Sequence, residues 1–211
     1  MSEEKKFVLL GISGSPRLGS TDYIVNDALN YAKSKWEEIQ TDYFSVHKKK
    51  LNFCIHCDHC IREKNGCVHK DDMNELYPKL IQAKAYILAS PVYQGNISGQ
   101  LKVVLDRCRA LVAADPNVFQ YKFGAAIAVG GDRIGGQEPT IHTILDFYVI
   151  NGIIPVGGGG FGGGNLGGTL WSRDRGARGV QEDAEGIKSV HKVVNKLLKL
   201  IKNFNQTSKE E

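Results

Sequence analysis

The segment that decides the fold is residues 7–21, which read Phe-Val-Leu-Leu-Gly-Ile-Ser-Gly-Ser-Pro-Arg-Leu-Gly-Ser-Thr. Its first half, residues 7–13, is a short apolar run of the kind that is buried in a parallel sheet. Its second half is a turn-rich loop, and beyond it apolar residues recur at helical spacing, namely Ile24, Val25, Ala28, Leu29 and Ala32. A buried strand, a loop and an amphipathic helix in this order predict the first strand–helix unit of an α/β fold.

The rest of the chain repeats this alternation. Strands are predicted around residues 39–46, 85–89, 123–129 and 152–156, and helices around 71–81, 101–108, 140–148 and 183–203. Such alternation predicts a parallel sheet with helices on both faces, a doubly wound arrangement. Five strands in 211 residues favour the flavodoxin-like order over the six-stranded dinucleotide-binding fold. We therefore expect one flavodoxin-like domain over residues 1–211, with residues 47–70 inserted after the second strand.

Composition excludes several classes of protein. Hydrophobic residues make up 42% of the chain and charged residues 24%, which is typical of a globular protein and excludes a disordered one. Lysine and arginine exceed aspartate and glutamate by only 27 to 23, so nothing indicates binding to nucleic acid. No apolar stretch approaches the ~20 residues that cross a membrane, and residues 1–6 are charged, unlike a signal peptide. We expect a cytoplasmic protein.

The loop after the first strand suits an anion. It lies where a strand meets a helix N-terminus, so backbone N–H groups and the helix dipole favour negative charge there. Hydroxyl donors come from Ser13, Ser15, Ser20 and Thr21, and Arg17 adds a charge that can contact phosphate through two N–H groups. The loop lacks the lysine of the Walker pattern, which favours a terminal monophosphate as ligand. The alternative is an ordinary turn with an N-cap at Ser20.

Two further loops follow predicted strands, at the edge where open α/β sheets bind ligands. Residues 90–98, Ser-Pro-Val-Tyr-Gln-Gly-Asn-Ile-Ser, offer the ring of Tyr93 for stacking, although Tyr93 taken alone fits a surface aromatic equally well. Residues 130–138, Gly-Gly-Asp-Arg-Ile-Gly-Gly-Gln-Glu, contain glycines that allow the backbone to approach a ring closely. The three loops together predict one ligand site.

The sharpest feature is the run Cys54-x2-Cys57-x2-Cys60-x6-Cys67. A total of five cysteines without an export signal argues against a disulfide framework. The spacing Cys-x2-Cys-x2-Cys opens ferredoxin-type runs, in which the loop directs three thiolates at one cubane. We infer that all four bind one [4Fe–4S] cluster, with structural zinc and unliganded thiols as alternatives. The fifth cysteine, Cys108, is predicted to be a small buried residue of a helix.

Charged residues and glycines accompany these motifs. The cysteines alternate with His56, His59 and His69, which we expect to face solvent or neighbour the sulfurs, and they are surrounded by Lys48, Lys49, Lys50, Arg62, Lys64 and Lys70. The basic residues form either a solvated surface or a docking patch for an acidic electron carrier such as ferredoxin. From residue 157 to 168, nine of twelve residues are glycine, and both a flexible surface loop and a lid or cofactor contact fit this composition.

At these residues the chain resembles a known family. Gly-Ser-Pro-Arg at 14–17, Ser-Pro-Val-Tyr-x-Gly-x-x-Ser at 90–98 and Gly-Gly-x-x-x-Gly-Gly-Gln-Glu at 130–138 look like the FMN-binding flavodoxin-like reductases. The compact four-cysteine run narrows this to the iron–sulfur flavoproteins of archaea and anaerobes. The resemblance implies that the phosphate of FMN is held by Ser13, Ser15, Arg17, Ser20 and Thr21. It implies that the isoalloxazine is flanked by Pro91, Val92, Tyr93, Gln94, Gly95, Asn96, Gly130 and Gly131. It also implies a homodimer or tetramer in which the cluster approaches a neighbour's FMN.

These features predict a redox flavoprotein carrying FMN and a [4Fe–4S] cluster. Electrons are expected to pass from a donor such as ferredoxin through the cluster to FMN and on to an acceptor, with the redox chemistry supplied by the cofactors. The alternative within the same class is an NAD(P)H-dependent FMN or quinone-type reductase. The alternative from another class is a non-enzymatic redox sensor, although no DNA-binding motif or effector domain supports it.

Overall fold

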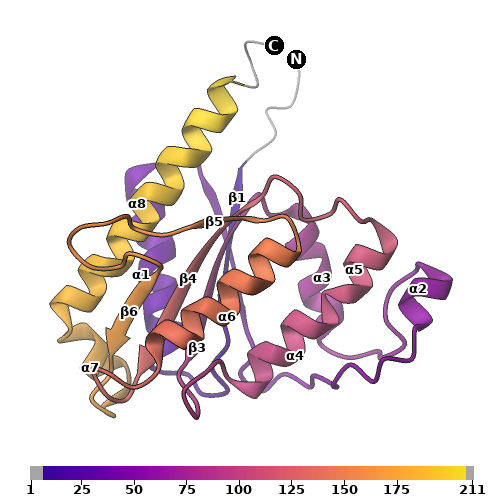
Figure 1. The fold of residues 1–211 in the computed structure, drawn as a ribbon, viewed down its shortest axis with the longest axis horizontal. Coiled ribbons are helices and arrows are strands. Elements are labelled where there is room, and N and C mark those ends of the chain that lie inside the picture. Colours follow the sequence, from indigo (N-terminus) through magenta and orange to yellow (C-terminus); the bar gives the residue numbers. More distant parts are fainter. Residues whose placement is uncertain (1–6, 208–211) are drawn as a thin grey trace.

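The computed structural model describes residues 7–207 and gathers the strands into one sheet (Figure 1). Within this range there are six, namely β1 (Val8–Ser13), β2 (Gln40–Ser45), β3 (Ala85–Pro91), β4 (Phe123–Gly130), β5 (Ile154–Val156) and β6 (Gly168–Trp171). Their order is β2-β1-β3-β4-β5, with β6 also paired to β4, and every pairing is parallel. This order confirms the predicted flavodoxin-like α/β fold. The charged stretch 1–6 lies outside the described residues.

Helices cover both faces of the sheet, as predicted (Figure 1). One face is covered by α1 (Ser20–Lys35), α7 (Gly176–Gln181) and α8 (Ala184–Thr207), and the other by α3 (Met73–Gln82), α4 (Gly99–Arg107), α5 (Arg109–Ala114) and α6 (Gln137–Ile150). The short α2 (His59–Glu63) lies at one end of the molecule, beside α5 (Figure 1). No helix within residues 7–207 is long and apolar enough to cross a membrane.

Strand β1 shows how the sequence builds this sandwich. Alternate side chains point to opposite faces, so Leu10 joins the core beneath α3, α4 and α6, while Leu9 joins the core beneath α1 and α8. Gly11 lies on the α1 face, where a Cβ atom would stand 2.6 Å from Cγ1 of Val25. The missing side chain therefore lets α1 lie close against β1, which fixes the loop between them.

The fifth position of the sheet is divided between two short strands. β5 pairs with Phe123–Ala125 of β4, and β6 pairs with the following residues, Ile127–Gly130. The glycine-rich stretch connects them and returns the chain to the same edge. A Cβ atom on Gly167 would stand 2.5 Å from the carbonyl oxygen of Ala126, and one on Gly168 would stand 2.5 Å from Cγ2 of Val190. Glycine is thus needed here for close packing, which is why strand propensity did not reveal β6.

Candidate functional site

The three predicted ligand loops leave the carboxyl ends of the neighbouring strands β1, β3 and β4, and they touch one another. The N–H of Gly14 donates to the carbonyl oxygen of Ala89 at 2.8 Å, and Oγ of Ser98 donates to that of Gly14 at 2.5 Å. A Cβ atom on Gly136 would stand 2.7 Å from Cα of Gly95, so the second and third loops also meet. The structure therefore brings the three loops together at one edge of the sheet.

The first loop is a tight turn with an exposed arginine. Oγ of Ser15 donates to the carbonyl oxygen of Arg17 at 2.6 Å and accepts from the Arg17 N–H at 3.1 Å. Ser13, Ser15 and Thr21 are buried, whereas Arg17 is exposed and its guanidinium has no partner among the described residues. An arginine held by its backbone and unpaired at its head is suited to an anionic ligand.

A buried carboxylate supports the start of α1. The N-cap is Gly19 and not Ser20, and its N–H donates to Oδ2 of Asp22 at 3.3 Å. Oδ1 of Asp22 accepts from the hydroxyl of Tyr43 at 2.5 Å and from Oγ of Ser45 at 2.9 Å. Burial, together with this carboxylate, raises the pKa of Tyr43 to about 12. This network could not be predicted from sequence, because β2 supplies two of its members from a distant part of the chain.

Replacing Asp22 by asparagine is expected to lower the stability of the protein and to raise its preference for a phosphorylated flavin. The free energy of unfolding should fall by roughly 1–3 kcal/mol, because hydrogen bonds to a charged group become neutral ones. If the first loop holds the phosphate, as the sequence predicts, the ratio of FMN to riboflavin affinity should rise, because a negative charge is removed beside that loop. Denaturant unfolding and flavin fluorescence titration measure both quantities. Asp27→Asn, farther along α1, is the control and should leave the ratio unchanged; an unchanged ratio in Asp22→Asn would contradict the expectation.

The second loop presents Tyr93 on a reverse turn. The backbone N–H groups of Tyr93 and Asn96 each donate to the other's carbonyl oxygen, at 2.8 and 3.0 Å. Between them Gln94 and Gly95 have left-handed φ angles of 49° and 78°. No atom lies within 4 Å of the position of a Cβ on Gly95, and Tyr93 is 36% exposed. The turn thus carries a partly exposed aromatic ring and, at Gly95, open space, both of which suit a planar ligand.

The glycines of the third loop are required by close packing within the protein. A Cβ atom on Gly130 would stand 2.3 Å from Nε2 of Gln137, and one on Gly131 would stand 2.5 Å from Oδ1 of Asp174. Nε2 of Gln137 also donates to the carbonyl oxygen of Asp132 at 2.7 Å. Gln137 and Asp174 therefore hold this loop against α6 and the segment after β6. Sequence reasoning did not identify Asp174.

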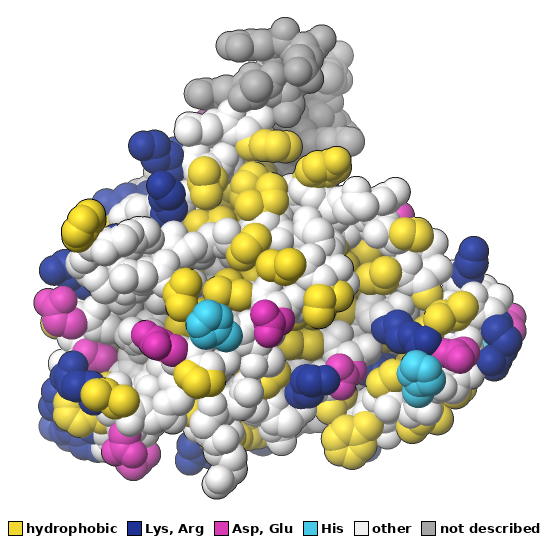
Figure 2. Space-filling model, in the orientation of Figure 1, with side chains coloured by type: hydrophobic (Ala, Val, Ile, Leu, Met, Phe, Trp, Pro, Cys, Tyr) yellow, Lys and Arg dark blue, Asp and Glu magenta, His cyan; other side chains and the backbone are white. Residues whose placement is uncertain are grey.

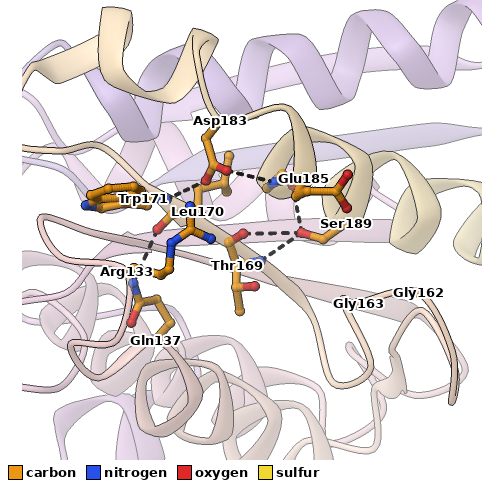
Figure 3. A pocket seen from close by; sticks show the side chains of 12 residues that line it. Arg133, Gln137, Gly162, Gly163, Thr169, Leu170, Trp171, Asp183, Glu185 and Ser189 are labelled. Atoms are coloured by element: carbon orange, nitrogen blue, oxygen red, sulfur yellow. Dashed lines mark hydrogen bonds between the residues drawn. The ribbon is translucent and has the colours of Figure 1, made fainter.

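A small cavity lies beside the third loop. Its volume is about 180 Å³, below the ~300–1,000 Å³ typical of ligand pockets, so we do not assign the flavin to it. Figure 3 shows Arg133 and Gln137 reaching this cavity from the third loop, with Asp183 across from them and Gly162 and Gly163 at its rim. Arg133 and Arg173 both lie over the ring of Trp171, with their guanidinium carbons 4.7 and 4.4 Å from its centroid.

The cysteine lobe, residues 47–70, follows the edge strand β2 and contains α2. Cys54 and Cys57 are exposed, Cys60 and Cys67 are half-buried, and all four thiols are free. Within residues 7–207, no group of three or more histidine, cysteine, aspartate or glutamate side chains is close enough to hold a metal ion. Cys108 lies apart from them; it is 2% exposed, as predicted, and burial raises the pKa of its thiol to about 12.

Several residues of the cysteine lobe have left-handed backbone conformations. His56 and Asp58, on either side of Cys57, have φ angles of 52° and 55°, and Lys64 has one of 52°. Such left-handed conformations cost energy for residues other than glycine, and they gather where a structure holds a ligand. Figure 2 shows Lys and Arg side chains beside exposed hydrophobic ones at the end of the molecule that α2 occupies in Figure 1.

Cationic side chains hold the cysteine lobe. Nη2 of Arg109, at the start of α5, donates to Oδ1 of Asp58 at 2.5 Å, and this hydrogen bond lowers the pKa of Asp58. The same guanidinium lies within electrostatic reach of Cys60 and Cys54. Nη1 of Arg62 donates to the carbonyl oxygen of Cys57 at 3.0 Å. Two arginines thus fasten the lobe, one through the Asp58 carboxylate and one through the carbonyl oxygen of Cys57.

Two buried nitrogen atoms that lack hydrogen-bond partners indicate whether the lobe suits an iron–sulfur cluster. Nε2 of His69 and Nε of Arg107 are the buried side-chain nitrogens or oxygens of the described residues that have no hydrogen-bond partner. His69 is two residues from Cys67, and Arg107 lies within electrostatic reach of Cys67. Sulfur atoms of a bound cluster would accept hydrogen bonds there. Four thiols with unpaired donors beside them have the chemistry of an iron–sulfur ligand set.

Comparison with known proteins agrees with this assignment. The family model described as NADPH-dependent FMN reductase matches residues 8–166. An iron-sulfur flavoprotein of Methanocaldococcus jannaschii is 56% identical over 194 residues, covering 92% of this chain and 96% of that protein. An iron-sulfur flavoprotein of Archaeoglobus fulgidus is 50% identical, covering 93% of this chain and 98% of that protein.

Among solved structures, RosB with the bound intermediate 8-demethyl-8-formylriboflavin-5'-phosphate has a TM-score of 0.73 at 16% identity, covering 95% of this chain and 81% of that chain. At this identity the likeness shows the fold alone. The matches to the two iron-sulfur flavoproteins, however, combine 56% and 50% identity with coverage of 92% and 93% of this chain. The chain is therefore an oxidoreductase that belongs to the NADPH-dependent FMN reductase family and, within it, to the iron-sulfur flavoproteins.

Proposed function

We propose that this flavoprotein transfers electrons from a donor such as ferredoxin, through a [4Fe–4S] cluster, to FMN and on to an acceptor. The observation that carries the proposal is the separation of two sites. The flavin loops meet at the carboxyl edge of β1, β3 and β4, whereas the four cysteines lie in a lobe that follows the edge strand β2. An exposed lobe with free thiols suits an entry point for electrons more than a structural support.

The chain's own residues bind and orient the cofactors. Arg17 and the hydroxyls of Ser13, Ser15, Ser20 and Thr21 would hold the phosphate of FMN, and the turn from Tyr93 to Asn96 would lie beside its ring. The cluster would be held by Cys54, Cys57, Cys60 and Cys67. When bound, the cluster supplies one-electron chemistry, and FMN supplies exchange between one- and two-electron transfer. The basic residues Arg62, Lys64 and Lys70 would attract an acidic donor.

We also propose a cytoplasmic homodimer or tetramer. The cysteine lobe follows the edge strand β2, and its helix α2 lies beside α5 at one end of the molecule (Figure 1). A neighbouring chain can bring its flavin loops to the lobe, which shortens the electron path. A monomer in sedimentation of the flavin-loaded protein would contradict this arrangement.

NAD(P)H is the second candidate donor. The matching family model is described as NADPH-dependent, and the Arg133–Trp171–Arg173 stack beside the third loop offers a ring and two cations to a phosphorylated nucleotide. In that case the flavin would accept hydride directly, and the cysteine lobe would be secondary.

One anaerobic experiment tests the proposal. The protein is purified without oxygen, and its iron, acid-labile sulfide and flavin are measured together with its visible spectrum. The flavin absorbance is then followed after addition of reduced ferredoxin or of NADPH. We expect iron and sulfide in equal amounts and fast bleaching by ferredoxin. Bleaching by NADPH but not by reduced ferredoxin would favour NAD(P)H as the donor. A protein without iron and sulfide would refute the cluster.

A further inference from the structure

Arg107 is a buried arginine at the end of α4, and its contacts lie at the base of the cysteine lobe. Its side chain is 1% exposed, and that of Asp71 is 3% exposed. Nη1 donates to Oδ2 of Asp71 at 2.9 Å, and Nη2 donates to Oδ1 of the same carboxylate at 3.1 Å. Nη1 also donates to the carbonyl oxygen of Asn52 at 2.7 Å. The guanidinium therefore contacts the chain on both sides of the four cysteines.

Asp71 joins the two ends of the cysteine lobe together with Arg107. Its Oδ2 accepts from the backbone N–H of Asn52 at 2.8 Å and from Nδ2 of Asn52 at 2.9 Å, and its Oδ1 accepts from the Met73 N–H at 3.2 Å. Burial acts to raise the pKa of Asp71, but the hydrogen bonds from Arg107 and Asn52 outweigh it and hold that pKa far below its usual range. The carboxylate stays charged, so the chain before Cys54 is fastened to the chain after Cys67.

Arg107 has one guanidinium nitrogen that takes no part in these contacts. Its Nε is buried and has no hydrogen-bond partner among the described residues, although its two terminal nitrogens are paired. A buried donor without a partner costs stability, so such a group calls for an acceptor. Cys67 lies within electrostatic reach of this guanidinium and also of Tyr77, whose hydroxyl donates to the Arg107 carbonyl oxygen at 3.3 Å. Cys67 is therefore the proposed ligand that has an electrostatic interaction with this guanidinium, although its sulfur does not accept from Nε in the chain as it stands.

We propose that Arg107 is a positioning residue for the iron–sulfur centre. Its terminal nitrogens close the base of the cysteine lobe through Asp71 and Asn52, and its Nε–H donates to a sulfur of the cluster or of Cys67. The inference rests on the proposed cluster. A hydrogen bond to sulfur stabilises the more negative, reduced state, so this donor raises the reduction potential.

Arg107→Lys tests both the contacts at the base of the lobe and the hydrogen bond to sulfur. Lysine keeps the positive charge but lacks the planar guanidinium and its Nε donor. We expect the loaded variant to have a midpoint potential lower by about 59 mV, a tenfold change in the equilibrium constant of a one-electron couple. We expect the metal-free variant to be cut severalfold faster by protease within residues 47–70. Arg178→Lys, which alters an exposed ion pair with Glu182 on α7 at the opposite face of the sheet, is the matched control and should change neither quantity.

The outcomes are separable. An Arg107→Lys protein with the wild-type potential and the wild-type rate of proteolysis would overturn the inference. A wild type without iron and sulfide would refute the proposed function instead, while proteolysis of the metal-free chains would still test the closure of the lobe. If Arg107→Lys does not fold, a structure of the loaded wild type decides. Arg107 Nε within hydrogen-bonding distance of a sulfur supports the inference, and Nε bonded to water or a carbonyl oxygen refutes it.

Discussion

Cys57→Ala is expected to lose the iron–sulfur centre and to keep FMN. Cys57 is exposed, and the lobe that carries it lies outside the six strands. The flavin loops are fixed by other contacts, such as the hydrogen bond from Ser98 to the carbonyl oxygen of Gly14. Removing one of four ligands should therefore degrade the cluster without unfolding the sheet. Reduction by ferredoxin should be lost, whereas reduction of FMN by dithionite should survive.

The measurement is made on protein purified without oxygen. The wild type should contain about four irons and four sulfides per chain, as a four-cysteine cubane does. Cys108→Ala is the matched control, because its thiol is buried in the helical layer and it should keep all of the iron. Wild-type protein that holds zinc without sulfide, or a Cys57→Ala protein still reduced by ferredoxin at the normal rate, would overturn this prediction.

The sequence predicted the fold well because its signals are local. The apolar run at 7–13 and the alternation of strands with helices required a parallel sheet, and parallel strands place the loops that follow them at one edge. The meeting of the three ligand loops follows from that geometry. β6 was not predicted. Gly167 and Gly168 pack closely against Ala126 of β4 and Val190 of α8, and a glycine-rich sequence does not show which distant residues it will pack against.

The supports of the candidate site could not be predicted for a different reason. Asp22 meets Tyr43 and Ser45 across about twenty residues, and Arg107 meets Asp71 across 36 residues. Each residue alone looks like an ordinary surface charge on a helix or loop. Only the folded chain shows that the partners are buried together. Motif spacing therefore predicts the groups that would touch the cofactors, whereas the residues that support those groups are visible only in three dimensions.

Arg17→Ala is expected to weaken FMN binding by roughly ten- to hundredfold, because a charge-assisted hydrogen bond contributes about 1.5–3 kcal/mol. Riboflavin, which lacks the phosphate, should bind the variant as it binds the wild type. The guanidinium of Arg17 has no partner among the described residues, so its removal leaves no buried group unpaired and the fold should be unaffected.

Fluorescence titration of the flavin-free protein with FMN and with riboflavin measures this effect. Arg133→Ala is the matched control, because that exposed arginine lies on the third loop, over Trp171, and not on the first. It should change the affinities for FMN and riboflavin by the same factor, since any contact it makes with the flavin would not involve the phosphate loop. If Arg17→Ala weakened both ligands equally, Arg17 would lie away from the phosphate, and the first loop would be an ordinary turn between β1 and α1.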